Sequence, residues 1–86
     1  MNEQIVEVFK ALGDPIRFKI YQSVRQREVC ACDFLSFLDL DISQPTLSFH
    51  LKKLVSCGLI VERKEGVFKH YKVNESLLKE IVDIFK

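Results

Sequence analysis

The chain has 86 residues, with 13 lysines and arginines and 12 aspartates and glutamates, so its formal net charge is +1. Hydrophobic residues make up 48% and charged residues 29%, a globular composition that excludes a disordered or fibrous protein. The three cysteines are too few for a disulfide framework, and no apolar run approaches the ~20 residues of a membrane span. We therefore expect one small cytoplasmic domain over residues 1–86, with neither a signal segment nor a membrane anchor.

The first half of the chain predicts three helices. Apolar residues at helical spacing indicate a helix over residues 2–12, which Gly13 ends. The pair Asp14-Pro15 is typical of the N-cap and first position of a second helix. Residues 29–32 are apolar and suit a brief strand, and residues 34–38 suit a short third helix.

The second half predicts a longer helix, a hairpin and a last helix. Ser43 is a good N-cap for a fourth helix, which extends to Cys57. Leu59–Glu65 and Val67–Val73 are rich in β-forming residues, and we expect Glu65-Gly66 to join them as a tight turn. Residues 75–86 form the last helix. The predicted fold is mostly α with a β-hairpin, in the order α-α-α-α-β-β-α.

The fourth helix has one apolar face and one polar face. Leu47, Leu51, Leu54 and Val55 recur at helical spacing and must face the core. The segment 43–61 contains no acidic residue, which suits a helix that faces phosphates. The residues that we expect to contact DNA from this helix are Gln44, Thr46, Ser48, Phe49, His50, Lys52 and Lys53.

The charge distribution and the element order both favour DNA binding. Residues 44–74 carry six positive and two negative residues, whereas residues 1–43 are mildly acidic. A short helix, a turn and a second helix form the helix-turn-helix unit, and the hairpin after it would be a basic wing. The expected wing contacts are Arg63, Lys64, Lys69 and His70. The alternative is an amphipathic surface helix followed by a solvated hairpin.

The sequence resembles a known family of regulators over nearly its whole length. The segment Ala11–Arg17 resembles the opening motif of the arsenic-repressor-like (ArsR/SmtB) winged helix-turn-helix regulators, and Ser43–Leu54 looks like their recognition helix. The resemblance implies a homodimeric repressor that binds a palindromic operator in double-stranded DNA and releases it when an effector binds. No Ser–His–Asp spacing, paired-carboxylate site or Gly-rich phosphate loop stands out in the sequence, so we do not expect an enzyme. Phe49 departs from the pattern because many members have arginine there, although phenylalanine can pack on a thymine methyl group.

The segment Glu28–Phe34 resembles the Cys-x-Cys-Asp metal box of the arsenic- and cadmium-sensing members. Two departures matter: the third cysteine of the arsenic-type box is replaced by Leu35, and the last helix lacks the histidine of zinc-sensing members. The resemblance implies As(III), Cd(II) or Zn(II) as the effector, with Cys30 and Cys32 as ligands.

The chemistry of Cys30 and Cys32 leaves three interpretations open. Thiolates bind soft metals, and residues i and i+2 face the same way only on an extended segment, so chelation requires a strand-like conformation. Two ligands are fewer than the four that zinc usually takes. The thiols could instead oxidise, or the cysteines could be small buried hydrophobic residues.

The terminal helices 2–12 and 75–86 are too apolar for an isolated domain of this size, so we expect them to pair across a two-fold axis. The expected interface residues are Ile5, Val8, Phe9, Leu78, Ile81, Val82 and Phe85. A dimer would present two recognition helices to successive major grooves. The alternative function is a winged-helix protein–protein interaction module without sequence-specific DNA binding.

Overall fold

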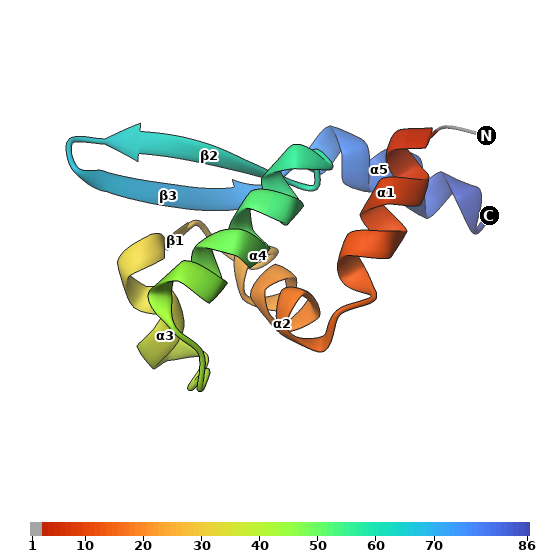
Figure 1. Ribbon diagram of the computed structural model, residues 1–86. Coiled ribbons are helices and arrows are strands. Elements are labelled where there is room, and N and C mark those ends of the chain that lie inside the picture. The colour runs from red at the N-terminus through yellow and green to blue at the C-terminus, as the bar shows by residue number, and fades with distance from the viewer. Residues whose placement is uncertain (1–2) are drawn as a thin grey trace.

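The computed structural model describes residues 3–86 as an elongated body of 37 × 25 × 19 Å. A β-hairpin projects from one end, and the first and last helices lie at the opposite end together with both termini (Figure 1). The elements are α1 (Glu3–Leu12), α2 (Pro15–Val24), β1 (Val29–Cys30), the 3-10 helix η1 (Ala31–Asp33), α3 (Phe34–Phe37), α4 (Gln44–Ser56), β2 (Ile60–Glu65), β3 (Phe68–Val73) and α5 (Glu75–Ile84). This is the predicted mostly helical winged helix-turn-helix fold.

Side-chain hydroxyl, carboxylate and amide groups fix where the three longer helices after α1 begin. The Asp14 carboxylate accepts hydrogen bonds from the backbone N–H groups of Ile16 and Arg17 at 2.8 and 3.1 Å. Ser43 caps α4 by accepting from the N–H of Thr46, and Asn74 caps α5 in the same way. These caps satisfy backbone donors that would otherwise be unpaired in the first turn of each helix.

One core joins all the helices to the sheet. Phe34, Ile20 and Leu54 are completely buried at its centre, and Tyr71 reaches it from β3. The residues of this core are Ile5, Val8, Ala11, Ile20, Val24, Val29, Phe34, Leu47, Leu51, Leu54, Cys57, Leu59, Ile60, Tyr71, Leu77 and Ile81. None of the helices in the described part of the chain combines the length and apolar character that a membrane span needs.

The sheet has three antiparallel strands in the order β1-β3-β2. The brief strand expected within residues 29–32 is present only at Val29–Cys30, and the chain then tightens into η1. Glu65 pairs with Phe68, so the two-residue turn is Gly66-Val67 and not the predicted Glu65-Gly66. Gly66 has φ 62°, a conformation that favours glycine and suits the first turn position of a hairpin.

The predicted third helix is shorter than expected. α3 ends at Phe37, one residue before the predicted end, and Asp39 has φ 49° in the left-handed region. A helix cannot continue through that conformation, and aspartate is one of the few residues that adopt it readily. The same segment contains the turn that leads to α4.

Three residues predicted for a dimer interface lie instead in the core of the single chain. Ile5, Val8 and Ile81 are at most 9% exposed and pack against the buried residues of other elements. The sequence shows that the terminal helices are rich in apolar residues, but it does not show which of these residues pack inside the single chain. The last helix also ends at Ile84 and not at residue 86, while residue 2 lies outside the described residues.

The Asp14 cap makes a prediction about pH and stability. Burial disfavours the charged carboxylate, but the hydrogen bonds from Arg17 and Ile16 outweigh this and hold its pKa below the ordinary value of 3.8. Ionised Asp14 therefore stabilises the fold fully above pH 3.8, and this contribution is lost as the pH falls through the lower pKa of the folded protein. Asp14→Ala should lower the free energy of unfolding by about 1 kcal/mol at pH 7.

Urea unfolding at pH 7, 5 and 3 measures this difference. The gap between wild type and Asp14→Ala should narrow between pH 5 and pH 3. Asp14→Asn is the matched control, because asparagine keeps the capping oxygen without the charge. A gap between wild type and Asp14→Ala that stays constant down to pH 3 would contradict the role of the charge.

Candidate nucleic-acid interface

The helix-turn-helix unit consists of α3, the turn after it and α4, which lies across the front of the molecule in Figure 1. α4 is held by its inner face, where Leu47, Leu51 and Leu54 are at most 4% exposed. Its opposite face is open to solvent over its full length. The arrangement is that of a recognition helix with a hairpin beside it.

The exposed face of α4 is polar and positively charged except for one aromatic side chain. Lys52 and Lys53 supply the charge, and Phe49 is 53% exposed between them and the N-terminus of the helix. The predicted contact residues that are exposed are Gln44, Thr46, Ser48, Phe49, Lys52 and Lys53. Because this face carries hydrogen-bonding groups and cations without a carboxylate, it can approach phosphates and base edges without repulsion.

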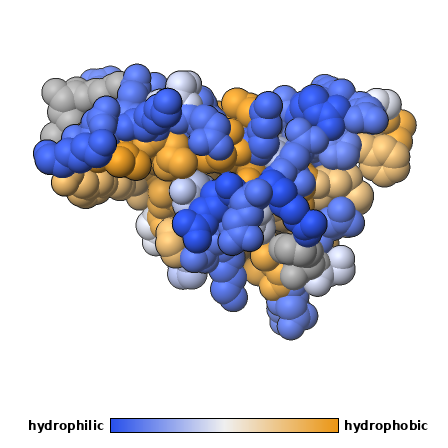
Figure 2. Space-filling view, turned by 180° about the vertical axis from the view of Figure 1, so that it is seen from behind, coloured by the Kyte–Doolittle hydropathy of each residue, from blue (hydrophilic) through white to orange (hydrophobic). Residues whose placement is uncertain are grey.

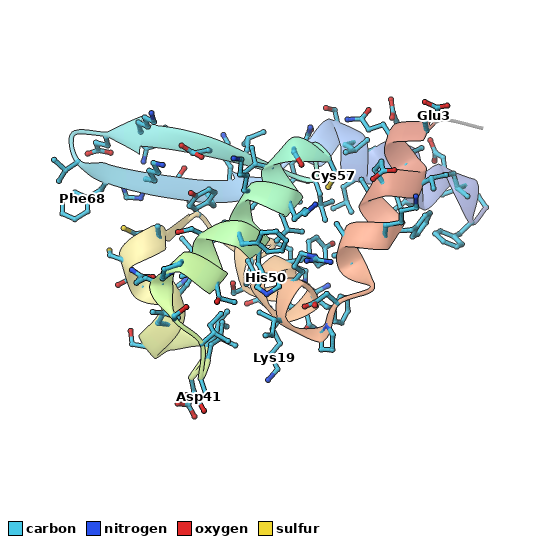
Figure 3. All side chains as sticks on the ribbon, in the orientation of Figure 1. Glu3, Lys19, Asp41, His50, Cys57 and Phe68 are labelled. Carbon is cyan, nitrogen blue, oxygen red and sulfur yellow. The ribbon has the colours of Figure 1, made fainter. Side chains whose placement is uncertain are left out.

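His50 is not on this face, so its predicted position is wrong. It is 7% exposed and lies between α4 and α2 (Figure 3). Arg17 reaches it from α2, with NH1 3.1 Å from Nδ1, and the Nε of Arg17 also donates to the carbonyl of Ala11 at 2.7 Å. His50 occurs three residues after Leu47 and four before Leu54, so helical spacing could have placed it on the inner face despite its polarity.

The wing is less cationic than its composition suggests. Arg63 donates from Nε and NH2 to the carboxylate of Glu28 and from NH1 to Glu65 at 2.7 Å. These hydrogen bonds raise the pKa of Arg63 and lower those of Glu28 and Glu65. Lys69 lies 3.8 Å from Glu62.

Two predicted wing residues remain to be placed. His70 faces the same carboxylates as Arg63, with its ring nitrogens 3.9 Å from Glu28 and 4.0 Å from Glu65. Of the four basic side chains predicted for the wing, Lys64 alone has no ion pair among the residues that the structure describes. Arg63 differs from Lys64 because its hydrogen bonds to Glu28 and Glu65 link the segment before β1 to the hairpin.

Cys30 and Cys32 come together with a third group that sequence reasoning did not count as a ligand. One ligand atom each of Cys30, Cys32 and Asp33 lie within 4.8 Å of one another. The extended conformation that we expected for this segment ends at Cys30, and a 3-10 turn follows it. Cys30 is extended and caps η1, its sulfur accepting from the N–H of Cys32, and the tight 3-10 turn brings Asp33 back. The position of Asp33 directly after Cys32 was the feature of the sequence that could have indicated this third ligand.

The thiol of Cys32 is protonated at neutral pH. The hydrogen bond with Cys30, aided by desolvation and the nearby Asp33 charge, raises the pKa of Cys32 to about 11. Cys57 is separate from the cluster: it is buried at the end of α4, its sulfur donates to the carbonyl of Leu54 at 3.3 Å, and burial raises its pKa. Cys57 is therefore a core residue.

Residues 14–61 match the family described as "Bacterial regulatory protein, arsR family". The chain belongs to this family. It is a DNA-binding transcription regulator and not an enzyme, as the sequence predicts. The matched residues include both helices of the helix-turn-helix, α3 and α4, and the start of the wing strand β2.

Two relatives of this arsR-family chain are regulators named for metal or metalloid resistance. It is 36% identical over 80 residues to an arsenical resistance operon repressor of Staphylococcus aureus, covering 93% of this chain and 75% of that protein. It is 35% identical over 80 residues to a homologue of a cadmium resistance transcriptional regulatory protein from the same species, covering 92% of this chain and 64% of that protein.

A solved structure from Mycobacterium bovis has the same fold. It is described as the homodimeric winged helix-turn-helix DNA-binding domain of a possible ArsR-family regulator. The TM-score is 0.78 at 25% identity, with 95% of this chain and 75% of that chain covered.

The ion pairs of the wing predict unequal roles for Lys53 and Arg63. If Lys53 contacts a phosphate, as the sequence predicts, Lys53→Ala should lower the slope of log affinity against log salt by about one. Arg63→Ala should leave that slope unchanged, because Arg63 is engaged by Glu28 and Glu65. Fluorescence anisotropy with duplex DNA between 50 and 200 mM salt measures both slopes. An equal loss of slope in the two variants would show that Arg63 leaves its carboxylates for a phosphate.

Proposed function

We propose that the protein is a homodimeric repressor that binds a palindromic operator through α4 and the wing, and that a thiophilic ion at Cys30, Cys32 and Asp33 releases it. The observation that carries the DNA-binding part is the open face of α4, which presents lysines and hydrogen-bonding groups with no carboxylate. From this face Gln44 and Ser48 are the base-reading candidates, and Lys52 and Lys53 meet phosphates.

An apolar surface at the end that carries the termini supports the dimer. Phe9, Val82, Ile84 and Phe85 are between 43% and 73% exposed, and the rings of Phe9 and Phe85 meet edge to face at 6.0 Å. Figure 2 shows hydrophobic residues at this end of the molecule, below a row of hydrophilic residues. Leaving such a surface in water is unfavourable, so a second copy of the chain is the partner that we propose. The homodimeric relative from Mycobacterium bovis agrees with this choice.

The dimer explains why the operator should be a palindrome. A two-fold axis through the terminal helices relates two copies of α4, which then face successive major grooves about 34 Å apart. The two half-sites of the DNA must follow the same symmetry. The alternative, a protein–protein module, leaves the cationic outer face of α4 without a use, and family membership favours the regulator.

Selection of bound duplexes from a random pool tests the proposal. We expect inverted half-sites whose centres lie about one helical turn apart. Val82→Glu places a charge in the proposed interface, at a side chain that is already 47% exposed, so the chain should fold, become a monomer in sedimentation and lose most of its operator affinity.

Val67→Glu is the matched control for the oligomeric state, because Val67 is 92% exposed at the tip of the wing, away from the terminal helices. This variant should remain a dimer. A dimeric Val82→Glu protein would rule out this interface, and a selected pool without inverted repeats would rule out symmetric operator binding.

The cluster of Cys30, Cys32 and Asp33 supports a thiophilic ion as the effector. Two sulfurs and one carboxylate are acidic groups that repel one another once ionised, and a bound cation removes that repulsion. Thiolates select soft ions, and three protein ligands leave a fourth position for water. This donor set fits Cd(II) or Zn(II), whereas As(III) would find only two sulfurs. Oxidation is the weaker alternative, since the raised pKa of Cys32 keeps the reactive thiolate scarce.

Ion binding should depend steeply on pH. The pKa of the Cys32 thiol is raised to about 11, so an ion that binds its sulfur must displace a proton. The apparent affinity for the ion should therefore rise about tenfold per pH unit for each proton released. Titration with Cd²⁺ between pH 6 and 8, followed by the ultraviolet band of the metal–thiolate bond, measures this rise. Arsenite and Zn²⁺ are the comparison ions.

Cys30→Ser and Cys32→Ser should lose both the band and the release of operator DNA by Cd²⁺. Cys57→Ser is the matched control, since its buried thiol lies outside the cluster, and it should keep both responses. Operator affinity of the wild type that is insensitive to Cd²⁺, Zn²⁺ and arsenite would sink the effector proposal while leaving the DNA-binding proposal intact.

A further inference from the structure

Phe49 is the one large apolar side chain on the polar face of α4 in the described part of the chain. It is 53% exposed, and at about 100° per residue it lies nearly opposite the buried row formed by Leu47, Leu51 and Leu54. A side chain there gains nothing from the core. In a helix that faces the major groove, it points at the base edges.

The ring of Phe49 is held in place before any ligand arrives. The ammonium of Lys53 lies 5.3 Å from the ring centroid, and the ring of His50 meets it edge to face at 5.6 Å. His50 is itself fixed by Arg17 beneath the helix. Two neighbours therefore contact the ring in the free protein, which lowers the side-chain entropy that is lost on binding.

The chemistry of the ring limits what it can recognise. Phenylalanine has no hydrogen-bond donor or acceptor, so it cannot distinguish the polar groups of base edges. The only apolar group that a major groove presents is the C5-methyl group of thymine. A cytosine in its place would lack the methyl group, and a purine would put polar groups against the ring, removing water from them without replacing their hydrogen bonds.

We infer that Phe49 sets part of the sequence specificity by packing on a thymine C5-methyl group in each half-site. The inference rests on the proposed operator binding and adds to it the identity of one base. Lys53 lies over one face of the ring and carries a charge that phosphates attract. In this arrangement a phosphate contact of Lys53 positions the helix, and Phe49 reads the base.

Replacing thymine by deoxyuridine tests the inference, because it removes only the methyl group. Each thymine of the selected operator is replaced in turn, at both symmetry-related positions, and affinity is measured by fluorescence anisotropy. With wild-type protein, one position should weaken binding about fourfold per half-site, the factor that corresponds to burying one methyl-sized group. Phe49→Ala should bind the thymine and deoxyuridine forms of that position equally.

Phe68→Ala is the matched control, because Phe68 is also 53% exposed but lies on the wing (Figure 3). It should keep the preference for thymine. Wild-type binding that is unaffected at every thymine, or a preference that survives in Phe49→Ala, would overturn the inference although the operator is still bound. A pool that yields no preferred sequence would instead overturn the proposed function, and this inference with it.

Phe49→Arg gives an independent test if Phe49→Ala binds too weakly to measure. Arginine pairs with O6 and N7 of guanine, so selection with this variant should yield guanine at the position where the wild type selects thymine. Continued selection of thymine by Phe49→Arg would show that residue 49 does not face that base.

Discussion

Three helices meet at the guanidinium of Arg17, and the orientation of the exposed face of α4 depends on it. Arg17 donates to the carbonyl of Ala11 at the end of α1 and to Nδ1 of His50 in α4. Because a guanidinium only donates, Nδ1 of His50 is the acceptor of this hydrogen bond. His50 is buried, so loss of Arg17 would leave its nitrogen unpaired at a cost of about 1–3 kcal/mol. The contact between Arg17 and His50 on the inner face of α4 thus fixes the orientation of the polar outer face of this helix.

Ion pairs with carboxylates also decide which basic side chains can attract phosphates. Composition alone spreads the basic stripe over α4 and the hairpin, but the carboxylates of Glu28, Glu62 and Glu65 occupy Arg63 and Lys69. α4 has no acidic neighbour within its own sequence. The positive charge that is not paired with a carboxylate is therefore concentrated on α4 more than the composition suggests.

Much of the fold could be predicted from local signals, and the errors have physical causes. The caps at Asp14 and Ser43 and the spacing of leucines in α4 are local properties, so their prediction was correct. The burial of His50 was missed because its polarity was given more weight than its helical spacing from Leu47 and Leu54. Its partner Arg17 lies 33 residues away, and no local pattern reveals that contact. Assignment of Ile81 to the core needed the packing of α5, since the sequence shows only that both stripes are apolar. The convergence of Asp33 with the cysteines depends on one 3-10 turn.

The position of the cysteine cluster joins the two elements that would meet DNA. Cys30 pairs with His70 of the wing strand β3, and Glu28 holds Arg63 of β2. On the other side, Asp33 leads directly into α3, the first helix of the helix-turn-helix. An ion that draws Cys30 and Asp33 together therefore acts on both elements within a few residues, without a long path through the core. Linkage then requires reciprocity: if the ion weakens operator binding by a given factor, the operator weakens ion binding by that same factor.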